Sequence, residues 1–529
     1  MNLGEYVIAT LEAWQVDTVF GIPGVHNAEL YRGLAGRAIR HVTPRHEQAA
    51  GFMADGYART RGKPGVCFVI TGPGLSNIAT AMLQARAASV PMLVISSTLP
   101  RRGLAMRRGQ LHEMPDQHGF GRELAVFSHT VSDVSQVPEV LQRAWSVFES
   151  ARPGPVHIDI PIDLMRADVD ALPPVMARLP QTPPVVDEQS LSNALDAVVS
   201  ATQPVVVLGG GGRDGAASAL SLAEKLQCPL VTTLAASDRV PARHPLVVNA
   251  SPSCAAVRGL IAAADVTLVA GSELGPTDFD MYDTGVAHDF GRLVRIDVDP
   301  MQLHTNYVAH VACCGDAADA LRRLDDALPA ASMAPAVYQR VEAVRAAALA
   351  EQSDAYREMI RLFDTLRDAV PELIVVGDSA QPVYACSTAF APGNAGMRFQ
   401  SSGGYGTLGY ALPAAIGAKL GNTEAPVLAL TGDGGLQFCL GELGTLADNG
   451  VPVVVVVWNN NGFGEIESYM TSIGVEASSC AVSAPDFAAV ASAYGLHAVS
   501  LDGTDGLVDA IDTAVRSGTG VLIDVRGVH

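Results

Sequence analysis

Two apolar runs that each end in a short polar signature place the strongest constraint on how this chain folds. Residues 427–431 lead into Gly-Asp-Gly-Gly at 432–435, and residues 453–458 lead into a pair of asparagines that ends at Asn460. Continuous apolar runs of this length are typical of strands in a parallel sheet. Consecutive strands of such a sheet end at one edge, so the Asp433 carboxylate and the Asn460 amide oxygen are expected to face one hard cation.

The residue types in this signature suit a magnesium ion and a phosphate group. Mg²⁺ takes oxygen ligands and usually keeps waters and phosphate oxygens in its shell. Gly434 and Gly435 carry no side chain, so their backbone N–H groups can approach a phosphate closely. A glycine-rich turn followed by an asparagine-rich turn, with no ligand, would give the same pattern.

Length and composition bound the class of protein. A chain of 529 residues is too long for one core, and three domains are expected. With 48% hydrophobic and 17% charged residues it should be compact and globular. A net charge of −20 argues against nucleic acid and against anionic membrane surfaces as partners.

The chain shows no feature that would send it to a membrane or an oxidising compartment. No apolar run is long enough to span a bilayer, and residues 1–5 lack the basic region of a signal peptide. The eight cysteines are scattered, and adjacent Cys313 and Cys314 are expected to be reduced thiols. We therefore expect a cytoplasmic protein.

Strand-like apolar runs alternate with helical patterns along the whole chain, which predicts parallel α/β layers. The Pro-rich stretch 166–190 indicates a linker, and four glycines at 209–212 after an apolar run indicate a Rossmann-like unit. The predicted fold is three doubly wound parallel-sheet domains. Their predicted boundaries are 1–165, 185–330 and 362–529.

A second motif lies far from the first. Residues 45–59 contain Glu47 at the start of an amphipathic helix, where a glutamate commonly acts as a cap or helix-dipole partner. The whole run resembles the HEQAA…GYAR signature of the acetolactate synthase-like enzymes that use thiamine diphosphate (ThDP). The spacing of 432–460 is similar to the ThDP fingerprint of the same family.

The resemblance covers nearly the whole chain and implies a role for each motif. It implies that Glu47 bonds N1′ of the cofactor's aminopyrimidine, and that the loops around residues 21–24 and 71–77 surround that ring. Leu408 would wedge between the two rings of ThDP. The implied cofactor contacts are Pro23, Gly24, Glu47, Pro73, Asn77, Gln381, Gly406, Leu408, Asp433, Gly434, Gly435 and Asn460. The implied Mg²⁺ ligands are Asp433, Asn460 and the carbonyl of Gly462.

The chemistry implied by the resemblance is decarboxylation of a 2-oxo acid through a C2 ylid and an enamine. In this family the pyrimidine loops come from one subunit and the diphosphate loops from another. The resemblance therefore implies a homodimer or homotetramer with active sites at the subunit interface.

Two departures from the family pattern bear on the substrate. Glu465 and Ile466 follow the metal signature where acetolactate synthases carry an apolar pair. Glu465 and Glu467 suit either a cationic substrate tail or a role as helix caps or solvated side chains. His112 lies in a loop with Glu113 and Gln117, and an imidazole that titrates near neutrality could handle protons after CO₂ leaves. Glu113, Gln117, Glu465 and Glu467 are the predicted substrate contacts.

The motif combination is most similar, within the family, to 5-guanidino-2-oxopentanoate (2-ketoarginine) decarboxylases, whose substrate carries a guanidinium that carboxylates bind well. A carboligase of acetolactate synthase type is the alternative, since it shares every motif. A non-catalytic family member and an NAD-dependent dehydrogenase are further alternatives, the latter resting on the glycines at 209–212 alone. Glu273 stands where acetolactate synthases place an arginine beside FAD, so no FAD is expected.

Overall fold

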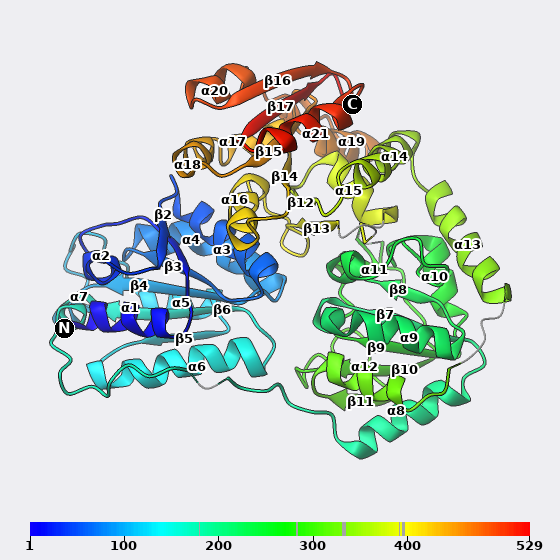
Figure 1. The fold of residues 1–529 in the computed structure, drawn as a ribbon, viewed down its shortest axis with the longest axis horizontal. Helices are drawn as coiled ribbons and strands as arrows, with labels where there is room; N and C mark the ends of the chain where they lie inside the picture. The colour runs from blue at the N-terminus through cyan, green and yellow to red at the C-terminus, as the bar shows by residue number, and fades with distance from the viewer. Residues whose placement is uncertain (179, 282–283, 331–334, 391, 394–396, 529) are drawn as a thin grey trace. The chain divides into compact units, whose positions relative to one another are not determined.

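The strands form three sheets, and the described strand pairs within them are parallel (Figure 1). The structure, a computed structural model, describes residues 1–529 except 179, 282–283, 331–334, 391, 394–396 and 529. By contacts the chain divides into two compact units. One unit contains residues 1–182, 376–379 and 404–528, and the other contains 183–375 and 380–403.

The first sheet has the strand order β2-β1-β3-β4-β6-β5. Its strands are β1 (Thr18–Gly21), β2 (Arg40–Val42), β3 (Gly65–Val69), β4 (Met92–Thr98), β5 (Phe127–Thr130) and β6 (Pro155–Pro161). The helices around it are α1 (Leu3–Ala13), α2 (Ala28–Leu34), α3 (Glu47–Arg61), α4 (Pro73–Ala87), α5 (Gln117–Leu124), α6 (Val137–Ser150) and α7 (Ile162–Met165). The order reverses between β1 and β3, and in sheets of this kind ligands bind beyond the strand ends at such a switch point.

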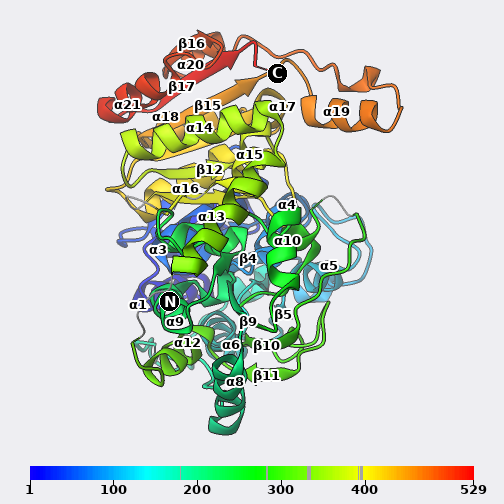
Figure 2. The same cartoon turned by 90° about the vertical axis from the view of Figure 1, so that its right-hand side faces the viewer.

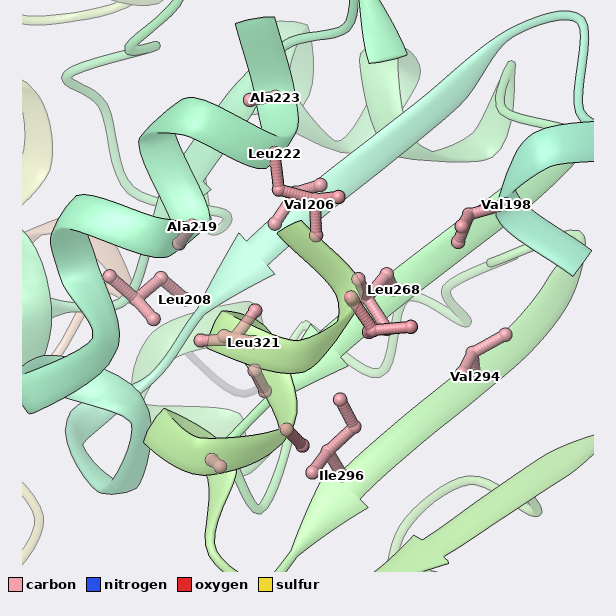
Figure 3. Packing of buried hydrophobic residues seen from close by; sticks show 14 of the residues in the cluster. Val198, Val206, Leu208, Ala219, Leu222, Ala223, Leu268, Val294, Ile296 and Leu321 are labelled. Atoms are coloured by element: carbon pink, nitrogen blue, oxygen red, sulfur yellow. The ribbon is translucent and has the colours of Figure 1, made fainter. Parts of the chain in front are cut away.

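The central sheet has the order β11-β10-β9-β7-β8. Its strands are β7 (Pro204–Leu208), β8 (Leu230–Thr232), β9 (Val266–Ala270), β10 (Arg292–Asp297) and β11 (Val311–Cys314). Its helices are α8 (Glu188–Ser200), α9 (Ala216–Leu226), α10 (Ala255–Ala262), α11 (Pro276–Phe279), α12 (Ala317–Asp326) and α13 (Pro335–Ala350). Figure 3 shows Val206 and Leu268 of the strands facing Leu222 of α9 and Leu321 of α12. A second apolar cluster, with Val207, Val257 and Val341, covers the other face, so this sheet is buried on both sides.

The third sheet has the order β13-β12-β14-β15-β17-β16. Its strands are β12 (Ile374–Gly377), β13 (Arg398–Ser401), β14 (Val427–Gly432), β15 (Val453–Asn459), β16 (His497–Asp502) and β17 (Val521–Arg526). Its helices are α14 (Asp354–Ala369), α15 (Gln381–Ala389), α16 (Ala411–Gly421), α17 (Asp433–Gln437), α18 (Glu442–Asn449), α19 (Gly464–Ser472), α20 (Phe487–Ala493) and α21 (Leu507–Ser517). In Figure 2, α19 stands clear of the strands of this sheet, and it contains no buried residue.

The prediction of three parallel-sheet α/β layers is confirmed, and the two signature runs are the strands β14 and β15. The predicted domain boundaries stay predictions. Short edge strands such as β2 and β16 carried no long apolar run and were not predicted from the sequence.

Helices α3 and α16 pack closely through glycines. A Cβ atom on Gly56 would lie 1.9 Å from the Ala414 carbonyl oxygen, and one on Gly417 would lie 1.9 Å from that of Met53. Beside them the buried Tyr410 hydroxyl donates to Asp55 Oδ1 at 2.6 Å. The helix that begins with Glu47 is therefore fixed against the segment that leads into α16.

We expect Gly417→Ala to destabilise the protein. The new methyl group meets backbone, so the helices must separate, at a cost of about 2 kcal/mol, or about 4–8 °C in apparent melting temperature. Gly259→Ala in α10 is the matched control, because nothing lies within 4 Å of its added Cβ. Equal melting temperatures for the two variants in a thermal-shift assay would contradict this account.

Candidate functional site

The loops predicted to surround the pyrimidine all leave one edge of the first sheet. Glu47 follows β2, Pro23 and Gly24 follow β1, and Pro73 follows β3. The strands are parallel and neighbouring, so their carboxyl ends place these loops side by side at the β1–β3 switch point.

Glu47 is buried and has a defined partner. It is the first residue of α3, only 8% exposed, and the Asn77 amide donates to its Oε2 at 2.9 Å. The preceding segment is anchored to α18, since the Arg45 backbone N–H donates to Glu442 Oε1 at 3.0 Å. The structure thus brings together the predicted contacts Glu47 and Asn77.

Backbone packing shapes the two neighbouring loops. The Gly24 N–H donates to Asn27 Oδ1 at 2.7 Å, and a Cβ atom on Gly24 would lie 2.6 Å from Ile70. Pro73 is exposed and stands in the first turn of α4, where a missing N–H costs no hydrogen bond. Gly24 therefore permits the close approach between the loop after β1 and the end of β3.

Gln117 lies in a fully bonded interior network. Its Oε1 accepts from the Thr71 hydroxyl at 2.6 Å and the Gly72 N–H at 3.0 Å. Its Nε2 donates to the Ser97 carbonyl at 2.8 Å and to Asp159 Oδ1 at 2.7 Å. The carboxamide is thus occupied by the protein, and a direct substrate contact at Gln117 stays a prediction.

Buried titratable groups lie behind Gln117. Burial raises the pKa of Asp159 to about 7, although hydrogen bonds from Ser96, Gln117 and Thr130 oppose that rise. Burial lowers the pKa of His157 to about 3. The neutral His157 ring contacts the Ser96 hydroxyl at 2.7 Å and the Ser128 hydroxyl at 2.9 Å. Through Gln117, this buried network holds the turn at residues 71–72 in place.

His112 lies beside a second histidine that the sequence analysis did not single out. The ring centroids of His26 and His112 are 5.1 Å apart. Because the two residues lie far apart in the sequence, their contact could not be predicted from local patterns. Glu113 lies in the same loop and accepts backbone N–H bonds from Arg108, Gly109 and Gln110, so it organises the loop, and its substrate role stays a prediction.

A carboxylate, an amide and a backbone carbonyl meet at the edge of the third sheet. The register pairs Gly432 with Trp458, which places the residues after β14 and β15 together. The Asn460 amide oxygen lies 3.2 Å from Asp433 Oδ1 and 2.8 Å from the Gly462 carbonyl oxygen, with no donor between them. Neighbouring oxygen ligands of an octahedral Mg²⁺ lie about 3 Å apart, so the spacing of these three groups fits that ion. With the amide turned over, its nitrogen would donate to both atoms instead.

The environment of Asp433 also fits a cation. Asp433 is buried, its Oδ2 has no hydrogen-bond partner among the described residues, and burial raises the pKa of its carboxyl. A bound cation would favour the ionised form. In the described part of the chain no three His, Cys, Asp or Glu side chains form a metal-binding group, so carbonyl and amide oxygens would complete the shell.

The glycines after Asp433 allow other side chains to pack closely against the backbone. A Cβ atom on Gly434 would meet Phe463 at 2.5 Å, and one on Gly435 would meet the Asp378 carboxylate at 3.1 Å. Asp378 follows β12 and accepts from the Gly409 N–H at 2.8 Å, and burial raises its pKa to about 6. It was not predicted as a site residue, although it directly follows an apolar strand, as Asp433 does.

The segment predicted to bend the cofactor precedes α16. Gly406 is exposed with φ +69°, Leu408 is half-buried, and the Thr407 hydroxyl is buried without a partner among the described residues. Gln381, the first residue of α15, belongs to the other compact unit, and its buried Oε1 likewise has no described partner. Glu465 and Glu467 lie in the first turn of the exposed helix α19.

The glycines at 209–212 serve close packing of two loops in the central unit. A Cβ atom on Gly209 would lie 2.3 Å from the Gly271 carbonyl oxygen, and the Gly211 N–H donates to that oxygen at 2.9 Å. These contacts account for the glycines without a nucleotide. Nearby, burial raises the pKa of Asp278 to about 6, and Glu273 adds to the rise.

Three family models match this chain in sequence. They are the N-terminal TPP binding domain, the central domain and the C-terminal TPP binding domain of thiamine pyrophosphate enzymes, over residues 1–120, 191–324 and 384–525. Thiamine pyrophosphate is another name for ThDP.

Curated proteins of the same kind match along most of the chain. A probable 2-ketoarginine decarboxylase of Pseudomonas aeruginosa is 41% identical over 94% of this chain and 88% of its own length. The large subunit of acetolactate synthase isozyme 1 of Escherichia coli is 30% identical over 99% and 93%. The chloroplastic acetolactate synthase of Arabidopsis thaliana is 28% identical over 99% and 81%. This chain belongs to the thiamine pyrophosphate enzyme family.

The family assignment confirms the predicted resemblance and the prediction of a ThDP-dependent enzyme. In the described residues, no helix is both long enough and apolar enough to cross a membrane.

Proposed function

We propose that this enzyme decarboxylates a 2-oxo acid without oxidation, using ThDP held through Mg²⁺. The observation that carries the proposal is that the Asp433 carboxylate, the Asn460 amide and the Gly462 carbonyl meet beside the glycines at 434–435. The first choice of substrate is 5-guanidino-2-oxopentanoate, which the name of the Pseudomonas relative supports. Bound ThDP would supply the electron sink that takes up the electrons released with CO₂.

The remaining chemistry belongs to the side chains of this protein. Glu47, fixed by Asn77, would hold the pyrimidine nitrogen through a hydrogen bond and share its proton. Leu408 would separate the two rings, and Gly406 would offer its carbonyl to the exocyclic amine. Pro23, Gly24 and Pro73 would shape the pyrimidine pocket, while Gln381 would contact the diphosphate.

We propose that Glu465 and Glu467 contact the cationic end of the substrate. Both lie in the first turn of α19, just after the predicted metal loop at residues 460–462; Glu467 is exposed and Glu465 is half-buried. A carboxylate there can bind a guanidinium bidentately without being buried unpaired. Glu113 and Gln117 would contribute by holding the loop of His112 in place.

An acetolactate synthase-type carboligase is the second candidate, favoured by relatives of about 30% identity along the whole chain. The two reactions differ only after CO₂ has left. In the carboligase the remaining carbon attacks a second carbonyl group, whereas in the decarboxylase it takes up a proton.

We also propose that the enzyme is a cytoplasmic homodimer or homotetramer. Each site edge carries exposed apolar side chains: Val25 and Leu111 near the first sheet, Tyr405 and Phe438 near the third. Phe438 is 61% exposed, which is unusual for a large aromatic residue. Two edges of this kind suit an isologous contact between two copies of the chain.

We propose further that the central unit binds no FAD. Glu273 stands where the family resemblance would put an arginine beside the flavin, and a carboxylate there repels the flavin's diphosphate. The buried Asp278 lies close enough to Glu273 for Glu273 to raise its pKa, so it adds a second acidic group.

Asp433→Asn should weaken Mg²⁺-dependent ThDP binding at least about tenfold, because one charged ligand is lost while its shape remains. Isothermal titration calorimetry with ThDP and Mg²⁺ measures this. Asp505→Asn, an exposed residue of the same unit, is the control and should bind normally. Unchanged affinity in Asp433→Asn would remove the metal assignment.

Product analysis with ThDP and Mg²⁺ distinguishes the candidate reactions. We expect CO₂ and 4-guanidinobutanal from 5-guanidino-2-oxopentanoate, with little turnover of pyruvate. Acetolactate from pyruvate, with the guanidino acid untouched, would identify a carboligase instead. Glu47→Gln should lower either activity by about a hundredfold or more, whereas the exposed control Glu139→Gln should not.

Sedimentation velocity with absorbance detection in the protein and flavin bands tests assembly and flavin content together. We expect a dimer or tetramer without flavin absorbance. A stable monomer would contradict the proposed subunit interface. A flavin absorbance band that sediments with the protein would contradict the proposal that the enzyme binds no FAD.

A further inference from the structure

A buried carboxylate joins the segment predicted to bend the cofactor to the end of the strand that carries Asp433. Asp378 directly follows β12 and is 1% exposed. Its backbone N–H donates to the Leu430 carbonyl oxygen of β14 at 2.8 Å, and β12 and β14 are neighbours in the third sheet. The carboxylate therefore lies inside the protein, beside the strand that leads into the predicted metal ligand.

Both oxygens of Asp378 accept hydrogen bonds. Oδ1 accepts from the Ser379 N–H at 2.7 Å. Oδ2 accepts from the Gly409 N–H at 2.8 Å and from the Thr431 hydroxyl at 3.3 Å. Hydrogen bonds to an ionised carboxylate are stronger than those between neutral groups. One side chain thus ties the residues before α16 to the end of β14.

The bond to Gly409 fixes a peptide plane that Leu408 shares. The Gly409 N–H and the Leu408 carbonyl belong to one planar group, so holding the N–H sets the direction of the Leu408 backbone. On its other side, a Cβ atom on Gly409 would lie 2.8 Å from Cβ of Phe438, which directly follows α17. The φ of Gly409 is +78°, which favours glycine. The peptide is therefore held between Asp378 and the helix that begins with Asp433.

The same carboxylate lies against the turn after Asp433. A Cβ atom on Gly435 would lie 3.1 Å from Asp378 Oδ2 and 3.0 Å from the Thr431 hydroxyl oxygen. Asp378 thus contacts both parts of the chain that hold predicted cofactor contacts of the third sheet, residues 406–409 and residues 433–435.

We propose that Asp378 is a positioning residue that keeps Leu408 in a fixed place relative to the turn at 433–435, so that ThDP bound there by its diphosphate is held with its two rings bent together. This rests on the proposed function, because Leu408 separates the rings only if the ligand is ThDP. Asp378 acts through the backbone of Gly409 and not on the reacting atoms. A carboxylate that only stabilised the fold would not distinguish a ligand with rings from one without them.

The first test measures ligand binding without turnover. Asp378→Asn keeps the shape of the side chain but replaces one oxygen with an NH₂ donor, so the hydrogen bonds that the carboxylate accepts cannot all form. In calorimetric titrations with Mg²⁺, we expect ThDP to bind about tenfold more weakly to this variant. Inorganic pyrophosphate, which has no rings, should bind within about twofold of the wild type. Asp297→Asn, a buried carboxylate at the end of β10 in the central sheet, is the matched control and should bind both ligands normally.

A milder variant keeps the test valid if Asp378→Asn does not fold. Thr431→Val removes only the hydroxyl bond to Asp378 Oδ2, and should weaken ThDP binding about threefold without affecting pyrophosphate. Equal losses for the two ligands in the variant that folds would overturn the positioning role. Wild-type protein that binds pyrophosphate but not ThDP would instead refute the proposed function.

The second test asks whether Asp378 acts through Leu408. In a Leu408→Ala background, Asp378→Asn should change ThDP affinity by less than about twofold, because the side chain that it positions is gone. The full tenfold loss in both backgrounds would contradict the proposal.

A kinetic measurement adds a third readout. With saturating ThDP, Asp378→Asn should lower kcat for 2-oxo acid decarboxylation about tenfold and leave KM within about twofold, because the cofactor is misplaced while the substrate contacts remain. An unchanged kcat together with a raised KM would place Asp378 at the substrate and overturn its assignment to the cofactor.

Discussion

Parallel pairing is the constraint on which this structure depends. Because neighbouring strands run in the same direction, their polar continuations collect at one edge instead of alternating between two. At the third sheet this places Asp433 and Asn460 together, and at the first sheet it places Glu47, Gly24 and Gly72 together. The strands themselves can be wholly apolar, since helices cover both faces of such sheets.

Burying polar side chains next to these edges requires that they be fully bonded. Gln117 meets that requirement with hydrogen bonds from Thr71 and Gly72 and to Ser97 and Asp159. Buried polar atoms that lack partners among the described residues are therefore worth locating. Asp433 Oδ2 and the Nδ1 atoms of His26 and His112 are such atoms, and each lies where a ligand is expected.

Glycine serves close packing at several points of this chain, and the sequence alone does not separate that purpose from ligand binding. Gly56 and Gly417 let α3 and α16 approach each other, and Gly209 lets two loops of the central unit touch. Gly434 and Gly435 likewise lie close to Phe463 and Asp378. Close packing explains the glycines at 209–212, on which the dehydrogenase alternative rested. That Gly434 and Gly435 also contact the cofactor stays a prediction.

The sequence by itself determined the layered parallel fold, the family, and the candidate residues at Glu47, Asp433 and Asn460, because long apolar runs and fixed local spacings are encoded along the chain. Only the tertiary structure decided which residues meet across the chain: Asn77 with Glu47, Gln117 with Asp159, and His26 with His112. It also assigned the Glu113 carboxylate to neighbouring backbone N–H groups. Contacts between distant loops depend on strand order and on loop conformation, and neither quantity appears in local sequence periodicity.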